Sequence, residues 1–252
     1  MKSAEGLVAL VTGASYGLGQ ATAEHLARDG FDVSVTDLNA GDLADTIKLV
    51  EGHGRNACGV SLDVRDVDSI DAAIAEVVEK MGKIDVLVNN AGIPCTKPAL
   101  EVSPEEFDNV QAINVRGCYF MSQRFARHLV DTKRRGSIVN IASTFAVIGV
   151  PRVSVYGISK AAVAGITRHL AADWAPYGIR VNAVGPGAVE TKLRKAGFAA
   201  DQEWRDWNLG RIPAGRFGEP EDTAAAVAFL ANPASDYVNG HLLLVDGALT
   251  VT

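Results

Sequence analysis

The sequence predicts an α/β fold in which a doubly wound, parallel sheet of seven strands carries helices on both faces. Seven short apolar runs, rich in β-branched residues, alternate with segments whose apolar positions recur at helical spacing. The chain has 252 residues, 48% of them hydrophobic, which is enough for one large sheet with a buried core. Its 25 glycines suit the many tight turns of such a sheet. We therefore expect a Rossmann-type sheet built as a single domain over residues 1–252.

Four short apolar strands separated by three helices make up the first part of the chain. The strands are expected at residues 7–12, 31–37, 56–62 and 84–88. The helices between them are expected at residues 17–29, 39–51 and 66–81. In the third helix Ile70, Ala73 and Val77 fall on one face, which is typical of a helix that packs on a sheet.

The second part of the chain repeats this pattern with longer helices. Ser103 is a favourable N-cap, Pro104 occupies the first helical position, and Glu105 lies in the first turn. The helix that starts here should run to about Lys133, with a break near Gly117. The remaining strands are expected at residues 137–142, 179–184 and 242–245, and the remaining helices at 154–175 and 219–232.

Residues 190–216, between the sixth strand and the last helix, have no clear period. Long irregular segments in a compact domain are usually functional, and we expect this one to be a lid over the substrate. Trp204 and Trp207, three residues apart, would share one face of a short helix. They would either contact the substrate or pack the lid against the body of the domain.

Composition excludes several classes of function. A net charge of −6 and a pI near 5.4 argue against nucleic-acid or anionic-membrane partners, which attract basic surfaces. The sequence has no apolar run of about 18 residues for a membrane span, and its N-terminal apolar run is too short for a signal peptide. The three cysteines lie far apart and the five histidines have no metal-ligand spacing, so neither a disulfide framework nor a metal site is expected. We expect a cytoplasmic protein that acts on a small molecule.

A glycine-rich turn, Thr-Gly-Ala-Ser-Tyr-Gly-Leu-Gly at residues 12–19, joins the first strand to the first helix. Gly13, Gly17 and Gly19 would let the backbone approach a pyrophosphate, toward which the helix N-terminus directs free N–H groups. The spacing is GxxxGxG and not GxGxxG, but a place between a strand and a helix is where a dinucleotide-binding loop is expected.

Asp37 ends the second strand, where a carboxylate can accept hydrogen bonds from the ribose hydroxyls of an adenosine. A 2′-phosphate would be repelled there, at a cost of about 4 kcal/mol for charges about 4 Å apart at an effective dielectric constant of about 20. Neither the glycine turn nor the following Leu38 and Asn39 supplies an arginine to offset that repulsion. The sequence therefore predicts NAD, not NADP, as the cofactor.

Tyr156 and Lys160 are four residues apart at the start of a predicted helix, so both side chains face the same way. A neighbouring ammonium group stabilises a phenolate, which allows a tyrosine to act as an acid or base. Ser143 lies at the end of the fifth strand, where ligands bind in sheets of this type. Together the three residues predict proton transfer to or from a bound alcohol.

With these motifs, the chain resembles the short-chain dehydrogenase/reductase family over about residues 7–247. The matching motifs are TGxxxGxG at 12–19, NNAG at 89–92, Ser143, YxxSK at 156–160 and Pro-Gly at 186–187. All occur in the family's order and with its spacing. Two departures are Gly185, where members often carry a small side chain, and Ala248, where a second glycine is frequent. Neither position bears on the chemistry.

The resemblance implies roles for individual residues. Tyr156 would take the alcohol proton, Ser143 would hydrogen-bond the substrate oxygen, and Lys160 would bind the nicotinamide ribose. Asn114 would hold a water in the proton relay. The residues expected to contact the cofactor are Gly13, Ser15, Tyr16, Gly17, Leu18, Gly19, Asp37, Asp63, Val64, Asn90, Ala91, Gly92, Tyr156, Lys160, Pro186, Gly187, Val189 and Thr191.

The sequence thus predicts an oxidoreductase that transfers a hydride between NAD and a secondary alcohol or ketone, with a small polyol, sugar or hydroxy acid as substrate. A 3-oxoacyl or other ketone reductase is an alternative, although its usual NADP preference conflicts with Asp37. A non-catalytic NAD-sensing regulator is a second alternative, against which the complete Ser143, Tyr156 and Lys160 set argues.

Two further expectations concern the surface. Arg152, Lys192 and Arg194 would either bind a substrate carboxylate or remain solvated. The family resemblance implies a homotetramer in which the helices at 103–133 and 154–175 pair across a two-fold axis, with the strand at 242–245 in a second interface.

Overall fold

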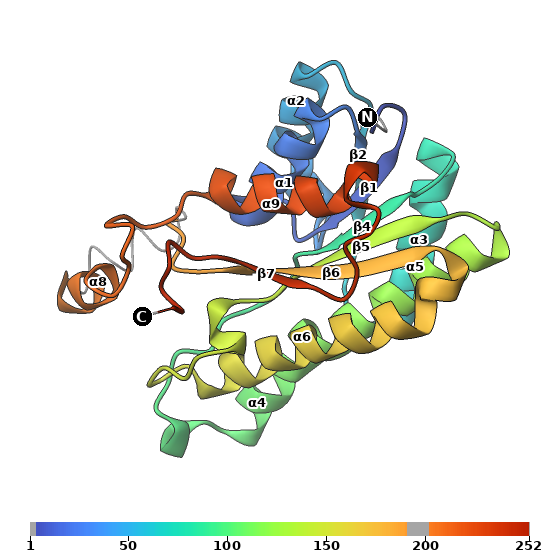
Figure 1. Cartoon of the computed structure of the whole chain (residues 1–252). Coiled ribbons are helices and arrows are strands. Elements are labelled where there is room, and N and C mark those ends of the chain that lie inside the picture. The colour runs from blue at the N-terminus through green and yellow to red at the C-terminus, as the bar shows by residue number, and fades with distance from the viewer. Residues whose placement is uncertain (1–3, 191–201, 252) are drawn as a thin grey trace.

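The computed structural model describes residues 4–190 and 202–251, which form a seven-stranded parallel sheet with helices on both faces (Figure 1). The order of the strands is β3-β2-β1-β4-β5-β6-β7, so the chain winds outward from β1 in one direction and then from β4 in the other. The strands are β1 (Val8–Thr12), β2 (Asp32–Asp37), β3 (Ala57–Ser61), β4 (Val86–Asn89), β5 (Gly136–Ile141), β6 (Ile179–Pro186) and β7 (Leu242–Val245). This arrangement confirms the predicted fold class.

The helices form two layers. One face of the sheet is covered by α1 (Gly17–Arg28), α2 (Ala44–Gly52) and α9 (Pro220–Ala231). The other face is covered by α3 (Val67–Met81), α5 (Cys118–Asp131) and α6 (Ser154–Trp174), with α4 (Pro104–Gln111) preceding α5. A short helix, α8 (Gln202–Leu209), stands apart from both layers at the end of the molecule where β6 and β7 finish (Figure 1).

Alternation along the central strands produces two cores. In β1, Val11 packs toward α1 and α9, whereas Leu10 packs toward α3 and α5, and both are completely buried. In β4, Val88 and Leu87 divide between the two faces in the same way. Strands buried on both faces read as continuous apolar runs, which is why these segments were predictable from composition.

Each predicted strand lies within two residues of its observed bounds. The predicted break in the helix at 103–133 is a π-helical segment, η3 (Ala112–Gly117), between α4 and α5. Ser103 caps α4 in a capping box, since its hydroxyl accepts a hydrogen bond from the Glu106 N–H while the Glu106 carboxylate accepts one from the Ser103 N–H. The expected N-terminus of this helix is therefore confirmed.

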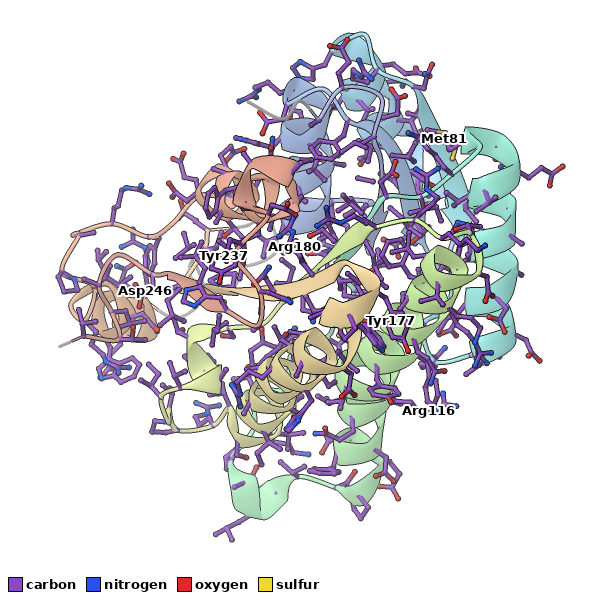
Figure 2. All side chains as sticks on the ribbon, turned by 45° about the vertical axis from the view of Figure 1, so that its right-hand side comes forward. Met81, Arg116, Tyr177, Arg180, Tyr237 and Asp246 are labelled. Atoms are coloured by element: carbon purple, nitrogen blue, oxygen red, sulfur yellow. The ribbon has the colours of Figure 1, made fainter. Side chains whose placement is uncertain are left out.

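Because all seven strands are parallel, their carboxyl ends lie at one edge of the sheet. The loops after β1, β2, β4, β5 and β6 converge there. Figure 2 shows Asp246, just after β7, on the α8 side of the molecule, while Met81 at the end of α3 lies on the opposite side. The Gly247 carbonyl accepts a hydrogen bond from the Ala214 N–H at 3.1 Å, which joins the C-terminal segment to the residues after α8.

Three further observations concern the cysteines, membrane spans and metal ligands. Cys58, Cys95 and Cys118 are free thiols, and burial raises the pKa of Cys118 to about 12. No helix in the described part of the chain is long and apolar enough to cross a bilayer. Among the same residues, no group of three or more His, Cys, Asp or Glu side chains is arranged to hold a metal ion.

Candidate active site

The turn between β1 and α1 exposes the start of α1 to a cavity. Gly13 and Gly17 have φ angles of +64° and +65°, a backbone region that favours glycine. The N-cap residue of α1, Tyr16, makes no side-chain capping hydrogen bond. The first N–H groups of the helix are therefore available to an anion, as in a pyrophosphate-binding turn.

Asn90 fastens this turn to the end of β4. Its side-chain amide donates to the carbonyls of Thr12 and Gly13, at 2.9 and 2.7 Å. A Cβ on Gly19 would lie only 2.6 Å from the Asn90 Nδ2, so any other residue would force the turn and Asn90 apart. The backbone N–H groups of Asn90 and Ala91 both donate to the Thr12 hydroxyl at 3.0 Å. The two motifs form one rigid unit.

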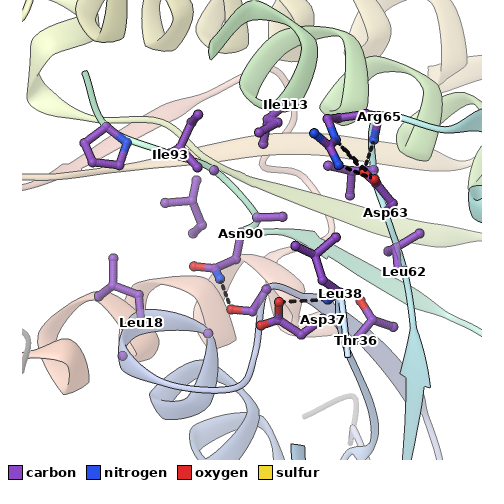
Figure 3. Close-up of a pocket in the computed structure, with 18 of the residues that line it drawn as sticks. Leu18, Thr36, Asp37, Leu38, Leu62, Asp63, Arg65, Asn90, Ile93 and Ile113 are labelled. Atoms are coloured by element: carbon purple, nitrogen blue, oxygen red, sulfur yellow. Dashed lines mark hydrogen bonds and ion pairs between the residues drawn. The ribbon is translucent and has the colours of Figure 1, made fainter. Parts of the chain in front are cut away.

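Asp37 lies at the end of β2 beside the same turn. Its Oδ2 accepts hydrogen bonds from the Ser15 hydroxyl and N–H, at 2.6 and 3.2 Å. Its Oδ1 accepts a hydrogen bond from the Leu38 N–H at 2.9 Å. The carboxylate is thus held in place, and it faces the cavity, as Figure 3 shows.

One elongated cavity of about 600 Å³ joins these features to the catalytic candidates. Thirteen of the predicted residues line it: Gly13, Tyr16, Gly17, Leu18, Gly19, Asp37, Asp63, Val64, Asn90, Ala91, Gly92, Tyr156 and Lys160. Figure 3 shows Asp63 with Arg65 on the right of the view, Asp37 near its lower centre and Ile93 on its left. The volume is in the range expected of a cofactor site.

Asp63 is paired with a neighbouring cation. The Arg65 guanidinium donates to both Asp63 oxygens, at 2.7 to 3.1 Å, and lowers the pKa of that carboxyl below its ordinary value. Arg65 and Lys160 are the two cationic residues among those that line the cavity. Because Arg65 is already paired with Asp63, a bound anion gains less from it.

Tyr156 and Lys160 lie in the first two turns of α6. The Lys160 ammonium is buried, donates to the Ile141 carbonyl at 2.8 Å, and lies 5.6 Å from the centre of the Tyr156 ring. The Phe145 ring packs edge-on against Tyr156, with centroids 6.2 Å apart. The Tyr156 ring therefore lies between the Lys160 ammonium and the Phe145 ring. Tyr156 and Lys160 are on the same side of α6, as their four-residue spacing predicted.

Ser143 follows β5 by two residues and lies two residues before Phe145. Its hydroxyl accepts a hydrogen bond from the Phe145 N–H at 3.2 Å, and the residue is buried. Since Phe145 contacts Tyr156, the serine and the tyrosine belong to the same end of the site. The hydroxyl remains able to donate a hydrogen bond to a substrate oxygen.

Asn114 lies in the π-helical segment and links three parts of the site. Its amide accepts from the Ile93 N–H at 2.8 Å and donates to the Ile93 carbonyl and to the Ser159 hydroxyl, both at 3.0 Å. Ser159 donates in turn to the Tyr156 carbonyl at 2.7 Å. A Cβ on Gly92 would lie 3.1 Å from the Asn114 Oδ1 and 3.4 Å from the Lys160 Nζ, so these residues meet at one point.

Six predicted residues in the described part of the chain do not line the cavity. Ser15 is bonded to Asp37, while Asn114 and Ser143 are placed as above. Pro186 ends β6, and the Gly187 N–H donates to the Val245 carbonyl at 2.9 Å. Val189 is buried and forms a β-bridge with Gly218. Thr191, Lys192 and Arg194 lie outside the described residues.

Sequence reasoning missed several residues that line the cavity. They are Thr36, Leu38, Leu62, Arg65, Ile93, Asn109, Ile113 and Ile141. Most are immediate neighbours of a predicted residue, so their position could have been inferred from the motif beside them. Asn109 has no such signal, because α4 reaches the cavity only through the tertiary fold.

The comparisons with known proteins agree with this geometry. Residues 13–250 match the family model described as enoyl-(acyl carrier protein) reductase. The chain is 42% identical to 2-dehydro-3-deoxy-D-gluconate 5-dehydrogenase of Escherichia coli K12, over 97% of this chain and 96% of that protein. It is 38% identical to gluconate 5-dehydrogenase of Gluconobacter oxydans 621H, over 99% and 97% of the two chains.

Solved structures superimpose closely. A short-chain alcohol dehydrogenase from Sinorhizobium meliloti 1021 gives a TM-score of 0.95 at 38% identity, covering 99% of this chain and 98% of that one. A gluconate 5-dehydrogenase from Burkholderia cenocepacia J2315, in complex with NADP and tartrate, gives 0.93 at 36% identity, covering 99% and 97%.

Fold and site define an oxidoreductase that uses a nicotinamide dinucleotide. The chain belongs to the short-chain dehydrogenase/reductase family, as the motifs indicated.

Proposed function

We propose that this protein is an NAD-dependent dehydrogenase of small polyols, sugars or hydroxy acids, which it converts between secondary alcohol and ketone. The observation that carries the proposal is that one cavity joins Asp37, next to the glycine turn, to Tyr156 and Lys160. The first part fits an adenosine ribose and a pyrophosphate, and the second fits an alcohol that must lose a proton.

Each residue at the Tyr156 end of the cavity has a separate role in the reaction. The bound cofactor supplies the hydride acceptor. Tyr156 takes the proton from the substrate hydroxyl, and the Lys160 ammonium lies beside it, 5.6 Å from the centre of its ring. Ser143 donates a hydrogen bond to the substrate oxygen and so fixes its distance from Tyr156. Asn114 holds the loop after β4 against α6 and supports a water in the proton relay.

The choice of NAD over NADP rests on the charge around Asp37. The relative from Burkholderia cenocepacia binds NADP, so the family alone does not decide the cofactor. In this proposal Asp37 faces the adenosine ribose and would repel a 2′-phosphate there. Asp42 and Asp45 line a smaller hollow beside Ser15 and Tyr16. Arg65 is paired with Asp63. The local charge therefore disfavours a phosphate.

A hydroxy acid derived from a sugar is the preferred substrate. The relatives from Escherichia coli and Gluconobacter oxydans are named for the oxidation of sugar acids. A 3-oxoacyl reductase remains the alternative, because the chain is also 38% identical to such an enzyme from Thermotoga maritima. A non-catalytic NAD sensor is disfavoured, since a sensor has no use for the Ser143, Tyr156 and Lys160 arrangement.

Residues 190–216 act as a lid in this proposal. Backbone hydrogen bonds from Glu190 N–H to Gly218 O at 2.8 Å and from Gly218 N–H to Ala188 O at 3.0 Å bring the two ends of this segment together. Trp207 is exposed and stacks against Arg211, 4.5 Å from its ring centre. A closed lid would exclude water from the reacting atoms.

We further propose a cytoplasmic homotetramer. Apolar side chains are exposed on the helices that the family resemblance places in an interface, including Tyr119 on α5 and Ile158 on α6. Phe229 on α9 and Tyr237 before β7 are also exposed, near the edge strand of the sheet. Light scattering should return about four times the chain mass of 26.5 kDa, and a value near one chain would contradict the proposal.

The proposed function is tested by measuring NADH release with a panel of alcohols at about pH 9, where loss of the alcohol proton is favoured. The panel holds sugar acids, polyols and 3-hydroxyacyl thioesters. We expect the highest kcat/KM with a sugar acid. A clear preference for the thioester would favour the reductase alternative, and NAD binding without turnover of any alcohol would favour the sensor.

A further inference from the structure

The turn that leads into α6 contains an arginine in a backbone conformation that arginine rarely adopts. Arg152 has a φ angle of +68°, in the left-handed region, and follows Pro151 within a turn. Glycine or asparagine is usual at such a position, because a Cβ is strained there. The other cation with a positive φ, Lys133 at +54°, lies just after α5, where this conformation commonly ends a helix. Arg152 has no such explanation.

Arg152 lies between two segments that border the cavity. Its carbonyl accepts a hydrogen bond from the Lys97 N–H at 2.7 Å, which joins it to the segment that includes Ile93 and Pro94, both in the cavity wall. Val153, the next residue, is the buried N-cap of α6, and Tyr156 lies one turn further along. The Arg152 backbone therefore joins the loop after β4 to the start of α6, four residues before the catalytic tyrosine, although Arg152 itself does not line the cavity.

The Arg152 guanidinium forms no ion pair within the described part of the chain. Its side chain is exposed and has no carboxylate partner in residues 4–190 and 202–251. Lys97, whose N–H bonds to the Arg152 carbonyl, is by contrast paired, because its ammonium donates to both oxygens of Glu106 at 2.9 Å. Arg152 therefore presents a positive charge that no carboxylate in the described residues offsets, and such a charge attracts an anionic substrate.

We propose that Arg152 is a specificity-determining residue that binds the carboxylate of a hydroxy-acid substrate. The inference rests on the proposed function, in which such an acid is oxidised at Tyr156. A guanidinium group offers a carboxylate two parallel, charge-assisted hydrogen bonds. A strained residue persists where its side chain is needed, which accounts for arginine in place of glycine or asparagine.

The test compares D-gluconate with D-glucitol, which has the same carbon skeleton but no carboxylate. Arg152→Asn removes the guanidinium and places a residue that tolerates the same φ angle. We expect the KM for D-gluconate to rise about tenfold or more, because a charge-assisted contact is lost. The KM for D-glucitol and for NAD should change by less than about twofold, and the Tm should be equal or higher.

Two further variants make the result specific. Arg152→Lys keeps the charge but not the paired geometry, and should recover part of the loss. Lys133→Asn is the matched control, because it also removes a cation at a positive φ angle, but far along the chain from the site. It should leave the KM values for D-gluconate and D-glucitol unchanged. Calorimetry of D-gluconate binding to the NADH complex provides a second measurement that does not depend on turnover.

The outcomes separate this inference from the proposed function. If Arg152→Asn leaves the KM and the affinity for D-gluconate within about twofold, the inference is wrong and the proposed function stands. The inference is also wrong if the unmodified protein uses D-glucitol as efficiently as D-gluconate. If it oxidises 2,3-butanediol but neither uses nor binds D-gluconate, both the sugar-acid assignment and the role of Arg152 fail. If no alcohol is oxidised, the proposed function itself fails.

Discussion

The two ends of the cavity are built in different ways. The end around Asp37 is formed mainly by consecutive segments, since β1, the glycine turn, α1 and β2 follow one another, and the Asp37 carboxylate is bonded to Ser15 within that unit. The end around Tyr156 is assembled from four separate segments, namely the loop after β4, the π-helical segment, the end of β5 and the start of α6.

This difference indicates which features can change independently. The cofactor end is built largely from its glycines, one carboxylate and Asn90, so we expect the charge of Asp37 to have the largest influence on the choice of cofactor. The substrate end depends on contacts between distant segments, such as that of Asn114 with Ile93 and Ser159. Substitutions there should affect turnover more than cofactor binding.

The largest effect is expected from Tyr156→Phe. The ring would still pack against Phe145, so NADH binding measured by calorimetry should stay within about threefold. Turnover should fall about a hundredfold to ten-thousandfold, because the proton acceptor is lost. Residual activity of a tenth or more would mean that another group serves as the base and that the substrate end has been assigned wrongly.

A smaller effect is expected from Asp37→Ala at the other end. Removing the carboxylate should weaken NAD binding through loss of the ribose hydrogen bonds and strengthen NADP binding through loss of repulsion, the latter by at most about 4 kcal/mol. The ratio of kcat/KM for the two cofactors should therefore shift toward NADP. Asp45→Ala, in the smaller hollow near Ser15, should shift it less. An unchanged ratio in Asp37→Ala would show that charge at this position does not select the cofactor.

The smallest effect concerns stability outside the cavity. The Arg216 guanidinium donates to both oxygens of Asp222, which caps α9, and lowers the pKa of that carboxyl below its ordinary value. Because the pKa is lower in the folded state, the pair stabilises the fold above the unfolded value of about 3.9, and this contribution is lost as the pH falls through the folded value.

Thermal unfolding of Arg216→Ala tests this pair. The variant should unfold at a slightly lower Tm than the unmodified protein near pH 7, and the difference should be small because solvent screens this largely exposed pair. The two Tm values should converge as the pH falls through the lowered pKa of Asp222, because the protonated carboxyl no longer forms the ion pair. A difference that is independent of pH would mean that Arg216 stabilises the fold through packing alone.

The fold was predictable because its signals are local. Apolar runs such as that of β1 and the glycine turn after it depend on neighbouring residues, and β7, a half-buried edge strand, was recognised by the same pattern. The π-helical segment could not be located in the same way, since its register is supported by bonds from Asn114 to residues 21 and 45 positions away. Sequence reasoning placed the break at Gly117, the end of that segment.

The motif residues of the site were predictable in the same way, but their contacts with distant segments were not. Motifs identified Asp37, Tyr156 and Lys160, but not the ion pair between Arg65 and Asp63, because the sequence does not show whether a surface arginine pairs or remains free. The strain at Arg152 was equally hidden, since a positive φ angle at a residue other than glycine has no sequence signal. Such features depend on how distant segments meet.

The most direct test of the account is the initial rate of nicotinamide reduction by the unmodified protein with D-gluconate, measured in parallel with NAD⁺ and NADP⁺. If one cavity joins a carboxylate that selects the cofactor to a phenol that accepts the proton, kcat/KM with NAD⁺ should exceed that with NADP⁺ by about tenfold or more. Equal efficiency with the two cofactors, or a preference for NADP⁺, would contradict the role assigned to Asp37, and no reduction of either would contradict the assigned substrate.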